Sequence, residues 1–238
     1  MAQGSAEHSG PPGNESFRID LHVHTTYSPD GEAGPRQMVE AAVAKGLAGM
    51  ALTDHNSMKG VGEALEAARE HPGFLIVPGM EVSSQGGHIL ALGLREPVAP
   101  GLPVEVTIEN ITAAGALAAA AHPFRRFSGL SGENIRINRF DAVEVMNGRS
   151  LQRKNLLSSQ LCEGLRLGTT AGSDGHNPLE LGRCFVSVDE RPGSAEGLLE
   201  LVRKRQTRPG GVSATYTEVL RTGSKIFREW VGRGGKRI

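Results

Sequence analysis

The sequence predicts an α/β fold whose strands close into a barrel. Its 238 residues are enough for one substantial domain with a full hydrophobic core. Short apolar runs alternate with amphipathic helical stretches, which is the pattern of a parallel sheet, open or closed. The polar side chains capable of chemistry fall at the ends of the predicted strands, and (β/α) barrels build their active sites at that carboxyl edge. We therefore favour a barrel over an open sheet.

In the first half of the chain, each predicted strand is a short apolar run next to polar residues. The run at 18–24 ends in two histidines. The first helix has Pro35 near its first turn and Gly46 at its end, as is typical of helix termini. The second strand stops at Asp54-His55-Asn56, and the third runs into Pro78-Gly79-Met80-Glu81. The strands predicted here are 18–24, 47–53, 74–77 and 88–94, and the helices are 35–45 and 59–70.

The second half continues the alternation. The alanine-rich run at 116–121 suits a helix in composition, but it is short, follows a helical stretch and ends in His122-Pro123, so we expect a strand. The strand at 141–146 ends in Asn147-Gly148, which is a turn signature. The strands predicted here are 116–121, 141–146, 167–172 and 184–188, and the helices are 103–113, 151–165, 194–205 and 216–231.

Both ends of the chain are expected to lie outside the barrel domain, which we place at 17–210. Residues 1–16 are rich in Gly, Pro, Ser and Glu and predict a disordered arm without the apolar core of a secretory signal. Residues 211–238 predict a C-terminal helix and a basic tail. No run is long and apolar enough to span a bilayer, so we expect a cytoplasmic protein that does not bind membranes.

Composition argues against several classes of partner. The 26 basic and 26 acidic side chains balance, so no overall charge attracts polyanions. Aromatic residues make up 4%, which is poor material for stacking single-stranded bases. Long nucleic acid is therefore disfavoured as a partner. Cys162 and Cys184 lack metal-type or redox-type spacing and are expected to be buried apolar side chains.

Nine side chains that can bind metal fall at or near the strand ends. His22 and His24 are two residues apart, so on a strand they share one face. Any one histidine alone would more often be structural, but nine N and O donors without cysteine exceed what one ion needs. They fit two or three zinc, manganese or iron ions in an open, hydrolytic site. The set is His22, His24, Asp30, His55, Glu81, His88, His122, Asp174 and His176.

These motifs, in this order, resemble the PHP (polymerase and histidinol phosphatase) metallohydrolases. The resemblance rests on DLHVHT with SPDG at 20–31, LTDHN at 52–56, PGMEVS at 78–83, GHIL at 87–90, AHP at 121–123 and GSDGH at 172–176. It implies a distorted seven-stranded (β/α) barrel with two or three metal ions at its carboxyl edge. It also implies three metal-ion shells. These are His22, His24, Glu81 and Asp174; Asp30, His55 and His176; and Glu81 as a bridge with His88 and His122.

Two departures from the family pattern bear on metal and substrate. Asp30 stands where some relatives have histidine, and a carboxylate there favours a harder ion such as manganese, iron or magnesium. Only residues 89–121 separate His88 from His122, too few for the small inserted domain of relatives that act on nucleotides or short RNA. The stretches GHIL at 87–90 and VEVMNGR at 143–149 look more like the compact branch that includes carbamate-ester hydrolases.

Four further residues are candidates for substrate binding: Arg125, Arg126, Asn147 and Arg149. An arginine beside metal ions can clamp a phosphate through two hydrogen bonds, although each arginine also suits a solvated loop and Asn147-Gly148 a plain turn. Asp20 and Asp54 flank candidate ligands and either orient imidazoles or only turn the chain. Asp174 and His176 are candidates for moving protons.

The function predicted from these residues is metal-dependent hydrolysis, first of all of phosphate esters. Clustered ions activate water, polarise the substrate and neutralise the leaving oxygen, so we expect a metal-bridged hydroxide to attack phosphorus. Substrates would be small phosphomonoesters, nucleotides or oligonucleotide ends. Two alternatives stay open: hydrolysis of a carbamate, carboxylic ester or amide at the same site, and a non-catalytic metal-binding or accessory module.

Overall fold

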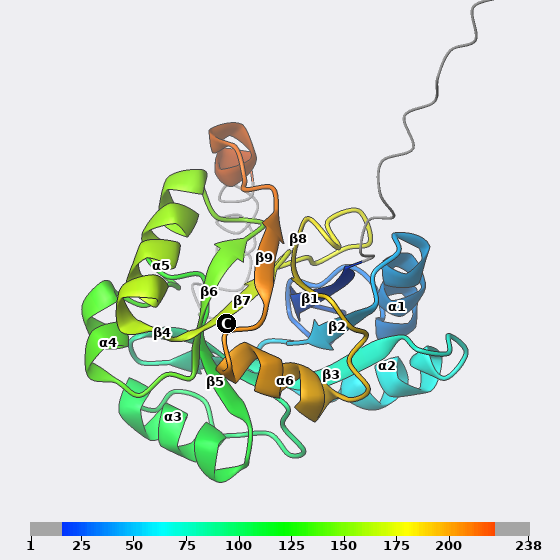
Figure 1. Ribbon diagram of the computed structural model, residues 1–238, viewed down its shortest axis with the longest axis horizontal. Coiled ribbons are helices and arrows are strands. Elements are labelled where there is room, and N and C mark those ends of the chain that lie inside the picture. The colour runs from blue at the N-terminus through cyan, green and yellow to red at the C-terminus, as the bar shows by residue number, and fades with distance from the viewer. Residues whose placement is uncertain (1–15, 222–238) are drawn as a thin grey trace, which may run out of the picture.

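Nine strands form one sheet that curves into a nearly closed barrel (Figure 1). The computed structural model describes residues 16–221. The strands are β1 (Phe17–Val23), β2 (Gly49–Leu52), β3 (Leu75–Ser84), β4 (Gly87–Leu92), β5 (Leu117–Ala120), β6 (Ala142–Asn147), β7 (Gly168–Gly172), β8 (Cys184–Val188) and β9 (Arg208–Gly211). The helices are α1 (Pro35–Ala44), α2 (Val61–Ala68), α3 (Val104–Ala113), α4 (Gly132–Ile137), α5 (Gln152–Leu165) and α6 (Ala195–Arg203).

The strand order is β7-β6-β5-β4-β3-β2-β1-β8-β9. The pairs β1–β2, β2–β3, β5–β6 and β6–β7 are parallel. The barrel closes between β1 and the segment after β7, where a parallel bridge joins Val23 to Gly175 and the His24 N–H donates to the Gly175 carbonyl at 2.9 Å. The α/β barrel predicted from the sequence is confirmed, and β1–β7 are its seven wall strands.

The sheet is mixed, whereas the alternation of elements predicts a parallel one. β4 pairs antiparallel with both β3 and β5, and β8 pairs antiparallel with β1. Only residues 85–86 connect β3 to β4, and such a short connection permits an antiparallel hairpin alone. β3 is accordingly longer than predicted, so Glu81 lies inside a strand rather than after one. The antiparallel course of β4 places its first residues, including His88, at the carboxyl edge of the barrel.

Two elements were not predicted from the sequence. α4 has six residues and begins at Ser131, whose hydroxyl accepts from the Asn134 N–H. β9 pairs with β8, but its Arg-Pro-Gly-Gly sequence has poor strand propensity. β9 also crosses the predicted domain boundary after residue 210. Residues 216–221 begin the predicted C-terminal helix; the rest of that helix, the basic tail and residues 1–15 of the predicted arm lie outside the described residues.

Hydrophobic side chains pack on both sides of the barrel wall. One buried cluster draws residues from each of β1–β8 and from α6, so it fills the interior. A second packs α3, α4 and α5 onto the outside, and a third packs α1 and α2. Cys162 and Cys184 are buried and free, as expected. Within residues 16–221, no helix is long and apolar enough to cross a membrane.

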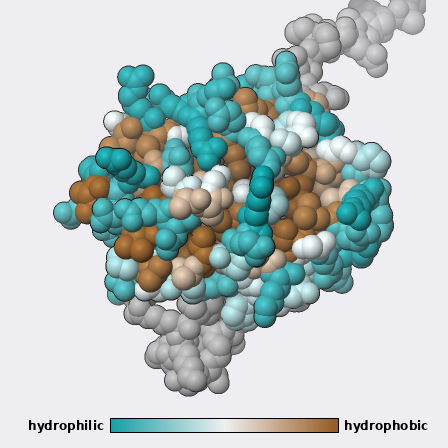
Figure 2. All heavy atoms as spheres, turned by 90° about the horizontal axis from the view of Figure 1, so that it is seen from below, coloured by the Kyte–Doolittle hydropathy of each residue, from teal (hydrophilic) through white to brown (hydrophobic). Residues whose placement is uncertain are grey.

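α6 covers the amino end of the parallel strands. At Gly168, the first residue of β7, an added Cβ would lie 2.5 Å from the carbonyl oxygen of Val202 in α6. Viewed from below, the side on which α6 lies in Figure 1, the surface mixes hydrophobic patches with hydrophilic side chains (Figure 2). The carboxyl edge, where the predicted site residues lie, is at the opposite end of the interior.

Candidate metal centre and active site

The structure brings all nine candidate ligands together. They form four overlapping groups, in each of which the donor atoms lie within 4.8 Å of one another. Seven separate segments contribute to the cluster. These are His22 in β1, His24 and Asp30 after β1, His55 after β2, Glu81 in β3, His88 in β4, His122 after β5, and Asp174 and His176 after β7.

Glu81 lies at the centre of the cluster and is 1% exposed. Its Oε1 lies 2.9 Å from His88 Nδ1 and 2.7 Å from His122 Nε2. Its Oε2 lies 3.3 Å from His22 Nε2 and 3.2 Å from His24 Nε2. A carboxylate that faces imidazoles with both oxygens is suited to bridge two ions.

His22 and His24 direct the same ring atom toward one point. Their Nε2 atoms are 3.0 Å apart. Asp174 Oδ1 lies 3.8 Å from the first and 3.5 Å from the second. Several lone-pair donors converging within a buried volume are what one cation requires.

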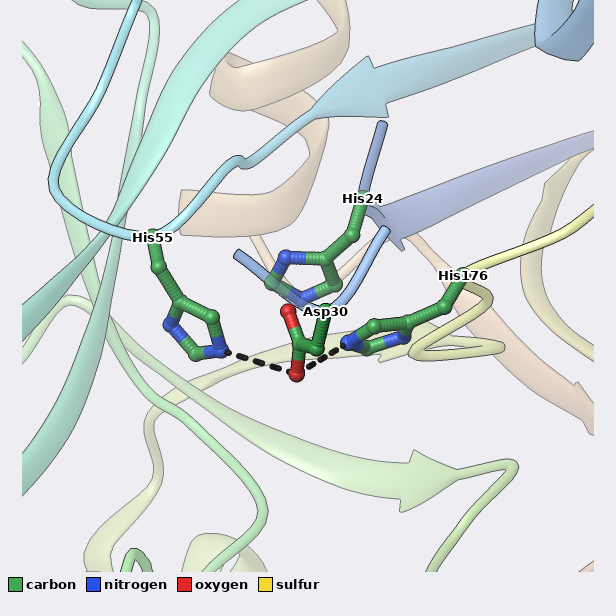
Figure 3. Close-up of side chains that lie close together, drawn as sticks. All are labelled: His24, Asp30, His55 and His176. Atoms are coloured by element: carbon green, nitrogen blue, oxygen red, sulfur yellow. Dashed lines mark ion pairs between the residues drawn. The ribbon is translucent and has the colours of Figure 1, made fainter. Parts of the chain in front are cut away.

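A second group surrounds Asp30 (Figure 3). Asp30 Oδ2 lies 2.9 Å from His176 Nε2 and 3.8 Å from His55 Nε2. In the close-up, the carboxylate points between the two imidazoles, and the His24 ring lies behind it. The loop after β1 therefore returns Asp30 to the strand ends.

The protonation of these groups follows from burial and from their neighbours. Burial lowers the pKa of His24 to about 4 and that of His55 to about 3. Burial acts to lower the pKa of His22 too, but the carboxylates of Glu144, Glu81 and Asp174 outweigh it and raise that pKa well above its ordinary value.

The carboxylates are held ionised. Burial acts to raise the pKa of Glu81 and Asp174, yet the neighbouring histidines and Arg125 hold both pKa values well below the usual range. Asp30 likewise has a lowered pKa despite burial, because of its hydrogen bond to His176. Neutral imidazoles, as at His24 and His55, beside ionised carboxylates are the protonation states that bind metal, and His22 must release a proton when it binds.

Three buried polar atoms of the cluster support a fit to cations. Asp30 Oδ1, His55 Nδ1 and His122 Nδ1 have no hydrogen-bond partner within the described part of the chain. Such orphaned atoms are costly unless something else satisfies them. The donors are all N and O of the types that zinc, manganese and iron accept. The residues present therefore fit divalent metal ions.

The flanking aspartates, whose roles the sequence left open, act differently from each other. Asp20 accepts from the backbone N–H groups of Ser173 and Gly182, at 2.8 and 2.9 Å, and so fixes the chain around the closure. Asp54 accepts from the Ser28 hydroxyl at 2.9 Å, and Ser28 Oγ lies 3.0 Å from His24 Nδ1. Asp54 therefore orients the His24 ring through Ser28.

Sequence reasoning missed Glu144, a buried carboxylate of β6 that lies 2.9 Å from His22 Nδ1. Its signal was weak, because it sits inside the run Val143-Glu144-Val145-Met146. A glutamate within an apolar strand is expensive to bury, and that cost alone could have identified it.

Three of the four predicted substrate-binding residues adjoin the cluster. Arg125 Nη1 donates to Asp174 Oδ2 at 2.6 Å, and Arg149 Nη1 lies 3.4 Å from His176 Nε2. The Asn147 amide donates to Asp174 Oδ2 at 3.3 Å. Arg126 is different: it is exposed, and its guanidinium lies over the Phe127 ring, 5.0 Å from the centroid. The structure does not bring Arg126 to the cluster.

Comparison with known protein families identifies the family of this chain. A model of the PHP domain matches residues 20–205, which include all nine clustered residues. The chain belongs to the PHP domain family. The coarse conclusion from the sequence, a PHP-type metal-dependent hydrolase, agrees with this membership and with the donor set.

Individual relatives are more distant. An uncharacterised protein of Methanocaldococcus jannaschii is 36% identical over 141 residues, which are 55% of this chain and 82% of that protein. A 3',5'-nucleoside bisphosphate phosphatase of Chromobacterium violaceum is 40% identical over 88 residues, but the match spans only 35% of this chain and 30% of the phosphatase.

A solved structure supports the fold. A two-domain protein from Bacteroides vulgatus, described as containing a PHP-like metal-dependent phosphoesterase, superposes with a TM-score of 0.70 at 21% identity. The superposition covers 93% of this chain and 73% of that one.

Proposed function

We propose that this PHP protein is a metal-dependent phosphoesterase acting on small phosphate esters. The observation that carries the proposal is the convergence of nine N and O donors from seven segments onto one buried cluster with arginines beside it. The name of the C. violaceum relative, a nucleoside bisphosphate phosphatase, supports nucleotides and other small phosphomonoesters as the substrate class.

The proposed metal shells are those implied by the family. One ion would be held by His22, His24, Glu81 and Asp174, a second by Asp30, His55 and His176, and a third by Glu81, His88 and His122. When bound, divalent ions of the manganese, zinc or iron kind acidify water and polarise a phosphoryl oxygen. We propose two or three such ions per chain.

The chain's own residues would bind and orient the substrate. The carboxylates of Asp174, Glu81 and Glu144 raise the pKa of Arg125 against the opposing effect of burial, so this guanidinium stays charged. A half-buried cation beside the cluster is suited to hold phosphate oxygens. Arg149 would offer a second guanidinium beside His176, and we propose that Asp174 and His176 pass protons to a leaving oxygen.

The proposal is tested by elemental analysis together with activity on an aryl phosphate after reloading with manganese or zinc. Two to three ions per chain, with activity lost in His24→Ala, are expected. Fewer than one ion per chain after reloading would contradict the metal centre. Full loading without phosphatase activity would contradict the substrate class and favour the alternative of carbamate or carboxylic ester hydrolysis.

Arg125→Gln separates the two ester classes. If Arg125 clamps phosphate, this variant loses about 100-fold or more in kcat/KM on the aryl phosphate and keeps activity on a neutral aryl ester. Arg139→Gln is the matched control, because Arg139 is exposed and precedes β6 at the opposite end of the barrel. Equal losses on both substrates in Arg125→Gln would contradict the clamp.

A further inference from the structure

Glu144 is a fully buried carboxylate on β6, the one strand of the barrel wall whose end supplies none of the nine clustered residues. It is 1% exposed. Burying a carboxylate costs several kcal/mol unless its oxygens are hydrogen-bonded. Each carboxylate oxygen of Glu144 has its own hydrogen-bond partners, and these partners indicate the role of the residue.

One oxygen is held by two N–H donors. Glu144 Oε2 accepts from the backbone N–H of His122 at 2.6 Å and from the Asn147 side-chain amide at 3.1 Å. The orientation of that amide is fixed from its other end, because Asn147 Oδ1 accepts from the Arg149 N–H at 3.0 Å and the Ser150 hydroxyl at 3.2 Å. Both donors to Oε2 are therefore fixed.

The other oxygen faces His22. Glu144 Oε1 lies 2.9 Å from His22 Nδ1. An ionised carboxylate can only accept, so Nδ1 must carry the proton. When the ring is neutral, as it must be to bind metal, Nε2 is left with a free lone pair, and it is this atom that faces His24 Nε2 and Glu81 Oε2.

We propose that Glu144 is a positioning residue that selects the tautomer of His22 and so prepares His22 Nε2 to bind metal. The inference rests on the proposed metal centre and extends it by one residue. Glu144 need not touch metal or substrate to act. It fixes the ring because its carboxylate is anchored to the loop after β5 and to the end of its own strand.

A single substitution tests this without changing the volume of the side chain. In Glu144→Gln, the amide oxygen must occupy the place of Oε2, where two N–H groups donate. The NH₂ group then faces His22 Nδ1, which becomes the acceptor. The ring proton moves to Nε2 and blocks the lone pair.

Zinc binding is the main readout. We expect Glu144→Gln to bind the tightest zinc ion about 10–100-fold more weakly than the wild-type protein, while Glu163→Gln, an exposed glutamate on α5, binds as the wild type does. Equal zinc affinities in wild type and Glu144→Gln would overturn the inference and leave the metal centre standing. A wild-type protein that binds no zinc would overturn the metal centre, and the inference with it.

A second measurement does not depend on the variant folding. Nitrogen-15 spectra of the histidine rings in the zinc-loaded wild-type protein distinguish Nδ1 from Nε2 coordination. We expect His22 to coordinate through Nε2 with a protonated Nδ1. Coordination through Nδ1 would overturn the inference.

Discussion

Single residues decide how closely β1 and β7 approach at the barrel closure. At Gly172, the last residue of β7, an added Cβ would lie 2.4 Å from the Cβ of His22 and 2.5 Å from its backbone nitrogen. Both are closer than real Cβ contacts, and neither neighbour is the end of a flexible side chain. Glycine is required here so that His22 can lie against β7.

Gly172→Ala should therefore lower stability and disturb the cluster together. Overpacking of this kind typically costs about 1–3 kcal/mol, and here β1 must move to accommodate the methyl group. We expect a lower midpoint of urea unfolding and fewer bound metal ions per chain. Wild-type metal loading in a destabilised Gly172→Ala protein would contradict the link between the closure and the cluster.

Gly164→Ala is the matched control. Gly164 lies in α5, and no heavy atom comes within 4 Å of an added Cβ. Alanine is favoured over glycine inside a helix by up to about 1 kcal/mol. This variant should be as stable as the wild type or more stable, with unchanged metal loading.

At the scale of elements, α5 holds the end of β6 in place through one side chain. Asn155, in the second turn of α5, is 7% exposed. Its Oδ1 accepts from the Asn147 N–H at 3.2 Å, and its Nδ2 donates to the Asn147 carbonyl at 3.1 Å. Nδ2 also donates to Ser213 Oγ at 2.9 Å, which joins the segment after β9 to the same point.

Asn155→Ala removes all three bonds and leaves the buried Asn147 N–H without its acceptor, while the Asn147 carbonyl keeps the bond from the Ser150 N–H. The expected cost is on the order of 2–3 kcal/mol in the free energy of unfolding, measured by urea denaturation. Gln160→Ala, a deletion of an exposed amide from the same helix, should cost under about 0.5 kcal/mol. Similar values for the two variants would show that Asn155 does not anchor the strand end.

The same scale explains which elements could be predicted. Most wall strands were identified because each is a short apolar run next to ligand motifs. The direction of β4 was not, because an apolar run has no polarity of its own; only the two-residue connection at 85–86 reveals a hairpin. β9 was not predicted, because its pairing with β8 overrides the poor strand propensity of its sequence.

The site shows a similar division. Local motifs identified the members of the cluster, and the structure brings all nine together. That these nine residues bind metal ions stays a prediction. Glu144 and Ser28 were missed because their roles arise from contacts between segments far apart in the sequence. The same limit applies to Arg126, which a sequence cannot distinguish from its neighbour Arg125.

At the scale of the whole molecule, the cluster concentrates uncompensated charge at one end of the barrel. Asp30, Glu81, Glu144 and Asp174 bring four carboxylates into or beside it, against two guanidinium groups, those of Arg125 and Arg149. With the His22 imidazolium, whose pKa is raised, and with Glu180, which pairs with Arg149, five carboxylates face three cationic groups and leave a difference of two negative charges. Bound cations would balance this difference, so stability and metal binding should be linked.

The metal-free protein should consequently lose stability as the pH falls from 7 to 5. His24 and His55 have pKa values lowered to about 4 and about 3, and His122 also has a lowered pKa. In the unfolded chain these imidazoles bind protons near pH 6.5, whereas in the folded protein they stay neutral until the pH is lower. Between pH 6.5 and 5, His24 and His55 therefore each contribute a loss of up to about 2 kcal/mol, and His122 acts in the same direction.

Two buried carboxyl groups change the stability in the opposite direction. Burial raises the pKa of Asp20 to about 6 and also raises that of Asp54. The folded protein binds protons there that the unfolded chain does not, so both add stability as the pH falls. For Asp20 this amounts to about 1 kcal/mol at pH 5. The raised pKa of His22 also adds some stability between pH 7 and about pH 6, where the imidazole of the unfolded chain is only partly protonated, and its contribution is constant at lower pH.

The lowered imidazole pKa values outweigh the two carboxyl groups and His22, and they leave a net loss on the order of 2 kcal/mol between pH 7 and pH 5. Urea denaturation in the presence of a chelator measures it directly. His55→Gln, which removes one of the three imidazoles, should reduce the difference between the two pH values by up to about 2 kcal/mol. A metal-free wild-type protein that is equally stable at both pH values would show that the cluster's histidines are not held neutral by burial.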